Sequence, residues 1–146
     1  MGNKRKYQQR AGDEGYTLLE LLVVLAILAL LATFAAPAVL KYLGSAKEDV
    51  AGVQLENLAA ALNLYRLEVG DYPSTDDGLQ ALLTAPKDAA SWNGPYLEKE
   101  SGIIDPWGTP YVYKKPGTDR AYDLMSYGAD KVAGGENENA DIVARK

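Results

Sequence analysis

The sequence predicts an α+β protein in which a long N-terminal helix packs on a small antiparallel β-sheet, with an acidic loop near the C-terminus. Three observations lead to this fold class. Residues 21–40 contain no charged side chain. Apolar residues then recur at helical spacing as far as Val69. Two short segments that favour strands, 111–114 and 122–127, are joined by a connection of the hairpin type.

Charge is divided unevenly along the 146 residues. The first 15 residues hold four basic and two acidic side chains, so the remainder holds 11 basic and 18 acidic, a net charge of −7. An acidic domain of this kind argues against nucleic-acid binding. The chain has no Cys and no His, which excludes Ser-His and Cys-His nucleophiles and the usual zinc sites. We therefore expect a protein that is not an enzyme, with oxygen ligands suited to a hard cation such as calcium.

The apolar run 21–40 is long enough to cross a hydrocarbon core of roughly 30 Å. Three interpretations compete for it. The first is a secretory signal peptide with a small-residue cleavage pattern at residues 36–38, and the second is a plain N-terminal membrane anchor. The third is a segment that stays in the mature protein and has a second role besides anchoring it. Glu20 stands at its start, and because a lone acid beside an apolar segment is costly, it requires a partner. The basic residues before the run predict a cytoplasmic N-terminus.

The helix is predicted to continue beyond Pro37 to the end of a second apolar pattern. Spacings of three and four residues place one set of apolar side chains on a single face: Leu55, Leu58, Leu62, Tyr65 and Val69. Gly70 and the following Asp-Tyr-Pro sequence predict the end of the helix. A helix from Thr17 to Val69 would extend for about 80 Å at 1.5 Å per residue. Its second half is expected to carry the globular domain on the apolar face.

The globular part is predicted to contain one short helix and three strands. Ser74 or Thr75 is expected to cap a helix that carries Leu79 and Leu82. Residues 92–97 and 105–111 are loops rich in aromatic residues, Gly and Pro. We expect them to fold onto the core, with carbohydrate stacking as the alternative. The strands are 111–114, 122–127 and, as a short third strand, 141–144.

The junction Gly-Tyr-Thr-Leu-Leu-Glu at residues 15–20 resembles the prepilin junction of type IV pilins and type II secretion pseudopilins. The resemblance implies that a prepilin peptidase cleaves between Gly15 and Tyr16 and that Tyr16 is then N-methylated. It divides the chain into a cytoplasmic leader (1–15), a transmembrane and filament-core helix (16–40) and a periplasmic globular domain (41–146). Glu20 becomes the fifth mature residue, and we expect its carboxylate to pair with the α-amino group of a neighbouring copy's Tyr16 during assembly.

Four downstream segments sharpen the resemblance to the major, G-type pseudopilins of the type II secretion system. They are 71–82, 92–96, 105–111 and 127–130. The family implies a pilin-like fold and a single-pass protein of the bacterial inner membrane. It also implies a homopolymeric helical pseudopilus that drives export of folded proteins across the outer membrane, with minor pseudopilins and an inner-membrane assembly platform as partners. The alternatives are a type IV pilin, a minor pseudopilin, or a secreted carbohydrate-binding or hydrolytic domain behind a signal peptide.

Residues 127–141 bring together acidic and amide side chains, which are potential metal ligands, around Gly134 and Gly135. Its spacing does not match an EF-hand, and composition alone is equally typical of a solvated acidic loop. Resemblance to the major pseudopilins implies a calcium site here. The ligands that it implies are Asp130, Asn137 and Asn139, with the carbonyls of Tyr127 and of Val132 or Ala133. Asp141 is either a second carboxylate ligand or only a strand residue.

Overall fold

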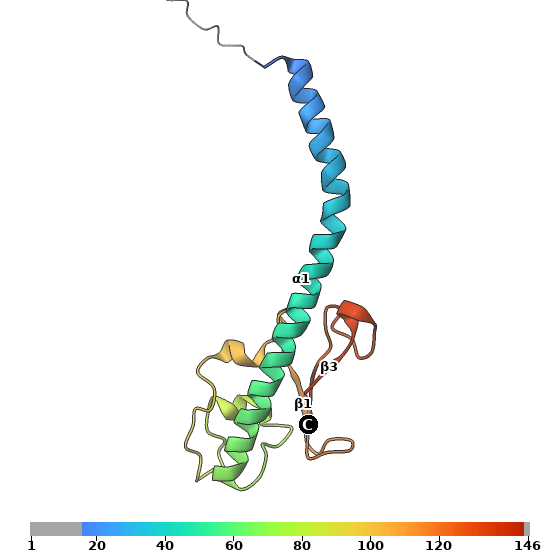
Figure 1. The fold of residues 1–146 in the computed structure, drawn as a ribbon. Coiled ribbons are helices and arrows are strands. Elements are labelled where there is room, and N and C mark those ends of the chain that lie inside the picture. The colour runs from blue at the N-terminus through green and yellow to red at the C-terminus, as the bar shows by residue number, and fades with distance from the viewer. Residues whose placement is uncertain (1–15, 145–146) are drawn as a thin grey trace, which may run out of the picture. The chain divides into compact units, whose positions relative to one another are not determined.

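The structure, a computed structural model, describes residues 16–144, so the predicted leader and its last residue Gly15 lie outside it. Its principal element is the helix α1, Leu18–Val69 (Figure 1). The chain divides into two compact units at residues 39 and 40, and the globular unit begins at Leu40. Within the described residues, α1 is the one helix long and apolar enough to cross a membrane, and its most apolar stretch has no residue buried inside the chain.

The second half of α1 buries the predicted apolar face. Leu55 and Leu62 are completely buried, and Leu58 and Tyr65 nearly so, whereas Val69 is half-buried. The helix ends where the sequence predicts. The N–H of Gly70 donates to the carbonyl of Arg66 at 2.8 Å, and Gly70 takes a left-handed φ of +101° that glycine adopts without strain.

Three short strands form an antiparallel sheet in the order β1-β2-β3 (Figure 1). They are β1 (Val112–Lys114), β2 (Asp123–Ser126) and β3 (Ile142–Val143). Each strand lies inside its predicted segment, and in register Tyr113 faces Leu124 and Ser126 faces Ile142. The core lies where α1 and the sheet bury their apolar residues together. Its members are Leu55, Leu58, Ala61, Leu62, Tyr65, Leu79, Ala81, Leu82, Tyr111, Tyr113, Leu124 and Ala144.

The predicted short helix is the 3₁₀ helix η1, Gly78–Leu82. Two further 3₁₀ helices follow, η2 (Glu100–Ile103) and η3 (Asn137–Asn139). The predicted cap was wrong, because neither the Ser74 nor the Thr75 side chain bonds to a residue of η1. The Ser74 hydroxyl closes the preceding turn by accepting from the N–H of Asp77 at 3.1 Å, while the Thr75 hydroxyl bonds to Lys115, the residue after β1.

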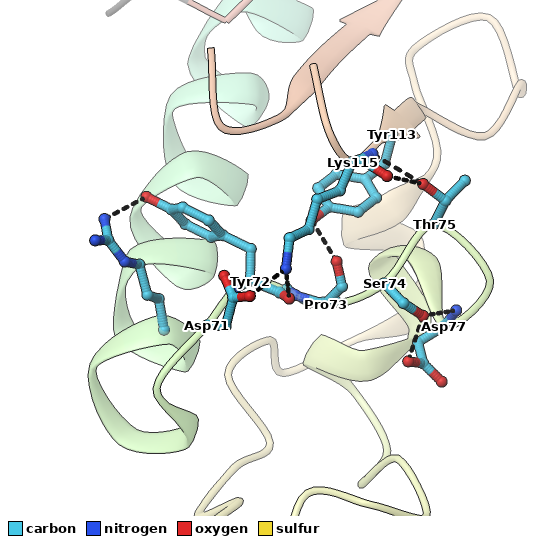
Figure 2. Close-up of polar contacts among 9 residues, drawn as sticks. Asp71, Tyr72, Pro73, Ser74, Thr75, Asp77, Tyr113 and Lys115 are labelled. Atoms are coloured by element: carbon cyan, nitrogen blue, oxygen red, sulfur yellow. Dashed lines mark hydrogen bonds and ion pairs between the residues drawn. The ribbon is translucent and has the colours of Figure 1, made fainter.

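A polar clamp fixes the end of β1 to the segment that follows α1 (Figure 2). The Nζ of Lys115 donates to the carboxylate of Asp71 at 2.6 Å and to the carbonyl of Tyr72 at 2.9 Å. The Thr75 hydroxyl donates to the carbonyl of Lys115 and accepts from its N–H, each at 2.8 Å. These contacts join residues 40 to 44 positions apart and hold the sheet against the end of the helix.

The predicted aromatic loops pack onto the core. The indole N–H of Trp92 donates to the carbonyl of Ala81 at 2.8 Å, and the Tyr96 hydroxyl donates to the Glu68 carboxylate at 2.6 Å. The Trp92 and Tyr96 rings meet edge to face, with centroids 5.7 Å apart. Because both rings are engaged with protein, their arrangement agrees with a packing role rather than carbohydrate stacking.

Candidate assembly and calcium-binding sites

The first residues of α1 form a reciprocal cap. The Thr17 N–H donates to the Glu20 carboxylate at 2.8 Å, and the Thr17 hydroxyl donates to the same oxygen at 3.0 Å. The Glu20 N–H in turn donates to the Thr17 hydroxyl at 3.1 Å. This is a capping box, in which a Thr and a Glu three residues later satisfy each other's backbone donors.

The cap gives Glu20 a role inside its own chain, which the sequence analysis missed. The signal was present, since Thr-x-x-Glu before an apolar run is the sequence pattern of a capping box. Both Glu20 and Tyr16 are exposed, and Tyr16 retains 90% of its exposure. The carboxylate therefore remains accessible to a neighbouring copy, and its predicted pairing with a neighbour's Tyr16 amine stays a prediction.

The side chains along the apolar run are exposed in the single chain. Leu22, Leu31 and Phe34, for example, retain 63, 59 and 74% of their exposure. The first half of α1 therefore requires either lipid or other helices around it, because apolar surface of this extent is unstable in water.

The backbone of the predicted calcium loop turns repeatedly through the left-handed region. Gly128, Gly134 and Gly135 have φ angles of +70°, +101° and +90°. Lys131 and Asn137 adopt +63° and +54°, which costs a Lys about 1 kcal/mol or more relative to its usual conformations. A Cβ on Gly135 would come within 2.2 Å of the Asn139 carbonyl oxygen, so this backbone approach requires glycine.

Two of the loop's carboxylates are organised by the backbone. Asp130 accepts from the N–H of Val132 at 3.1 Å, and Asp141 accepts from the N–H of Gly134 at 3.0 Å. The second oxygen of Asp141 is buried and has no hydrogen-bond partner. A buried carboxylate oxygen without a donor is unfavourable unless a cation or another donor reaches it. Asp141, which the sequence left open as a ligand or a strand residue, thus has an unsatisfied oxygen.

Most of the predicted ligands lie at the surface. Asp130, Val132, Ala133, Asn137 and Asn139 are exposed. Tyr127 is half-buried just after β2. Among the described side chains of residues 16–137 and 139–144, no three acidic groups are gathered closely enough to hold a metal.

A calcium shell at this loop would therefore draw on amide and carbonyl oxygens as well as carboxylates, which is the mixed donor set that calcium accepts. The unsatisfied oxygen of Asp141 and the all-oxygen chemistry of the loop fit that ion.

A buried carboxylate fixes the point where the loop leaves the sheet. Asp105 is 5% exposed, and its Oδ1 accepts from the N–H groups of Trp107 and Thr109 at 3.0 and 2.8 Å. Its Oδ2 accepts from the Ser126 hydroxyl at 2.6 Å, and the Ser126 oxygen accepts from the Gly128 N–H at 3.2 Å. Sequence analysis placed Asp105 in a loop without a role, because its partner Ser126 lies 21 residues away.

Two families match the chain in succession. The family described as Prokaryotic N-terminal methylation motif matches residues 10–36, and the family described as Type II secretion system (T2SS), protein G matches residues 38–145. Together they cover the junction, the apolar run and the globular unit.

Relatives and a solved structure agree with these matches. The chain is 43% identical to type II secretion system core protein G of Pseudomonas aeruginosa, over 92% of this chain and 96% of that protein. It is 40% identical to the protein of the same name from Vibrio cholerae, over 88% of each. The crystal structure of the major pseudopilin from the type 2 secretion system of enterohaemorrhagic Escherichia coli is similar, with a TM-score of 0.58 and 30% identity, over 68% of this chain and 86% of that one.

Proposed function

The chain belongs to the type II secretion system protein G family, and from this premise we propose that it is the polymerising subunit of a pseudopilus. The family is one of structural pseudopilins and not of enzymes. The observation that carries the proposal is the succession of an N-terminal methylation motif and a protein G domain, which together cover nearly the whole chain. Within this family, assembly of the filament helps to export folded proteins across the outer membrane.

The physical basis of assembly is the exposed apolar half of α1. Before assembly it is stable only in a bilayer, with the basic leader in the cytoplasm and the globular unit in the periplasm. In the filament, helices of neighbouring copies would replace the lipid. A heterologous contact that does not close on itself builds a filament instead of a ring. Minor pseudopilins and an inner-membrane assembly platform are the partners that we propose for this process.

The mature N-terminus tests this function most directly. We expect mass spectrometry of the chain, purified from cells that contain a prepilin peptidase, to find an N-methylated Tyr16 as the first residue. The apolar run is then retained, as filament assembly requires. A chain that begins near Val39 would instead mean signal-peptide removal, and it would contradict the proposed function.

We further propose that the loop 127–141 holds one calcium ion. Asp130 and Asp141 would supply charged oxygens, the amides of Asn137 and Asn139 neutral ones, and the carbonyls of Tyr127 and of residue 132 or 133 the remainder. Support comes from the unsatisfied oxygen of Asp141 and from a backbone that turns back on itself at glycines. A bound ion would link parts of the loop between which the described residues form few hydrogen bonds.

Calcium should therefore stabilise the globular unit. We expect calcium to raise the melting temperature of a fragment that begins at Ala46 by about 10 °C at saturation, because ligand at 100 times its Kd adds about 2.7 kcal/mol. Asp130→Ala should abolish the rise. Asp119→Ala removes an equal charge from the exposed turn between β1 and β2 and should leave the rise intact. Equal melting curves in calcium and in chelator would contradict the site.

A further inference from the structure

A hollow of about 420 Å³ opens beside residues 40–47 of α1, where the globular unit begins. Its walls come from the helix, from the 105–109 turn and from the start of the loop 127–141. The lining residues are Leu40, Leu43, Gly44, Lys47, Trp107 and Ala129. All six belong to the globular unit, so the hollow is a feature of this unit alone.

The surface around the hollow combines apolar side chains with a lysine. We name it the Trp107 surface and define it as Leu40, Leu43, Lys47 and Trp107. Leu40 and Leu43 retain 65 and 52% of their exposure, and Lys47 is exposed. Trp107 is half-buried, and among the described residues the core cluster includes Trp92 but not Trp107. The Trp107 ring therefore borders an open hollow instead of completing the core.

Two further side chains extend this character around the helix at the same level. Tyr42 retains 76% of its exposure, and Lys41 is exposed. Neither Lys41 nor Lys47 forms an ion pair with a side chain that the structure describes. In the sequence, no carboxylate stands between Glu20 and Glu48. This part of the chain thus carries positive charge alone, which complements an anionic ligand.

The apolar run gives the level at which the Trp107 surface would meet a bilayer. Residues 21–40 would extend for about 30 Å as a helix, which matches the thickness of a hydrocarbon core. Leu40 is the last residue of the run, and Gly44 lies about 6 Å and Lys47 about 10 Å further along the helix. Each headgroup layer is roughly 5–7 Å thick. A bilayer that holds the run would therefore place its headgroups beside the hollow.

The residue types suit that layer. Trp and Tyr are enriched where a membrane meets water, because their rings are apolar and their N–H or O–H groups are polar. A Lys can lay its apolar stem along hydrocarbon while its ammonium group reaches a phosphate. Trp107 is 60 residues from Lys47 in the sequence, and the fold brings both to one hollow.

We propose that the Trp107 surface binds the headgroups of anionic phospholipids in the membrane leaflet next to the globular unit. Lys41 and Lys47 contact the phosphates, and the Trp107 ring lies beside the upper acyl chains. This inference rests on the proposed function, since it requires the apolar run to lie in a bilayer before assembly. It adds that the globular unit itself contacts lipid, through a side chain far from the run in sequence.

Quenching of tryptophan fluorescence by brominated lipids tests this contact in the full chain. The sequence contains two Trp, so Trp92→Phe leaves Trp107 as the single reporter, and Trp107→Phe leaves Trp92. Trp92 is the matched control, because it packs against Tyr96, which bonds to Glu68 near the other end of the helix. Both variants are reconstituted in phosphatidylcholine vesicles, with or without phosphatidylglycerol, in which the upper acyl chains carry bromine.

We expect bromine to lower the Trp107 emission at least about two-fold in vesicles that contain phosphatidylglycerol, and to leave the Trp92 emission nearly unchanged. Lys47→Glu should remove the additional quenching of Trp107 that phosphatidylglycerol gives. Lys87→Glu makes the same charge change in the exposed loop before Trp92 and should keep that quenching. The unsubstituted chain provides the test without a Trp variant, because bromine should remove only the Trp107 share of its emission.

The outcomes separate this inference from the proposed function. A chain that floats with the vesicles but whose Trp107 is quenched no more than Trp92 would overturn the lipid contact and leave the proposed function intact. Equal quenching of Trp107 with and without phosphatidylglycerol would overturn the recognition of anionic headgroups. A chain that does not float with the vesicles would contradict the membrane role of the apolar run, and with it both proposals.

Discussion

Glu20→Ala is expected to leave the chain in the membrane but to abolish filament formation. The apolar run that holds the chain in the bilayer is unchanged by the substitution. In a filament core, however, the neighbour's charged α-amino group would lose its partner. Removing one member of a buried ion pair costs about 3–5 kcal/mol, which corresponds to a loss of more than about 100-fold in assembly. The measurements are the amount of chain in washed membranes and the amount of sedimentable filament.

The capping box makes a second variant necessary. Glu20 accepts two hydrogen bonds from Thr17 in its own chain, so Glu20→Ala also weakens the start of α1. Gln serves in a capping box nearly as well as Glu, but it carries no charge. Glu20→Gln should therefore keep the helix start and still block assembly. Thr17→Val is the converse variant, because it removes the Thr17 hydroxyl from the cap but keeps the charge of Glu20. This variant should therefore still form filaments. Normal filaments from Glu20→Gln would show that Glu20 acts through the cap alone.

The long helix and the sheet were predictable because their signals are local. Apolar residues at spacings of three and four identified the buried face of α1, and Gly70 marked its end within one residue. The strands follow from short segments that favour extended backbone, and each observed strand lies within its predicted segment. The structural assignment that failed was the cap of η1, since Thr75 bonds to Lys115, 40 residues away, and no local pattern encodes such a partner.

The candidate sites were likewise predictable only where their signals are local in the sequence. The junction at Gly15 and Tyr16 and the acidic loop are contiguous in sequence, so their residue types were visible at once. The sequence alone does not show which loop carboxylate has an unsatisfied oxygen. For Asp141, the burial of that oxygen depends on how the loop folds back near β3. The role of Asp105 was hidden for a similar reason. Its function is to accept hydrogen bonds from groups that the fold brings to it.

Asp105→Ala should be among the most damaging single substitutions in the globular unit. It removes the oxygen that accepts from the N–H groups of Trp107 and Thr109 in the 105–109 turn, and it removes the acceptor of the buried Ser126 hydroxyl. We expect a loss of about 3–5 kcal/mol in the free energy of unfolding, since hydrogen bonds to a charged group contribute about 1.5–3 kcal/mol each. By the usual scaling, the melting temperature of the fragment from Ala46 should fall by about 15 °C or more.

Asp71→Ala is the matched control for this prediction. Asp71 also accepts two hydrogen bonds, from Lys115 and from the Tyr72 N–H, but 73% of its side chain is exposed. Water can replace both contacts, so the loss should stay below about 1 kcal/mol. Asp105→Asn should fall between the two, because it keeps an acceptor for the turn but presents an amide to the Ser126 hydroxyl. Equal unfolding free energies for Asp105→Ala and Asp71→Ala would mean that burial does not give Asp105 its importance. A large difference would place the anchor of the loop 127–141 at the buried contact between Asp105 and Ser126, outside the loop itself.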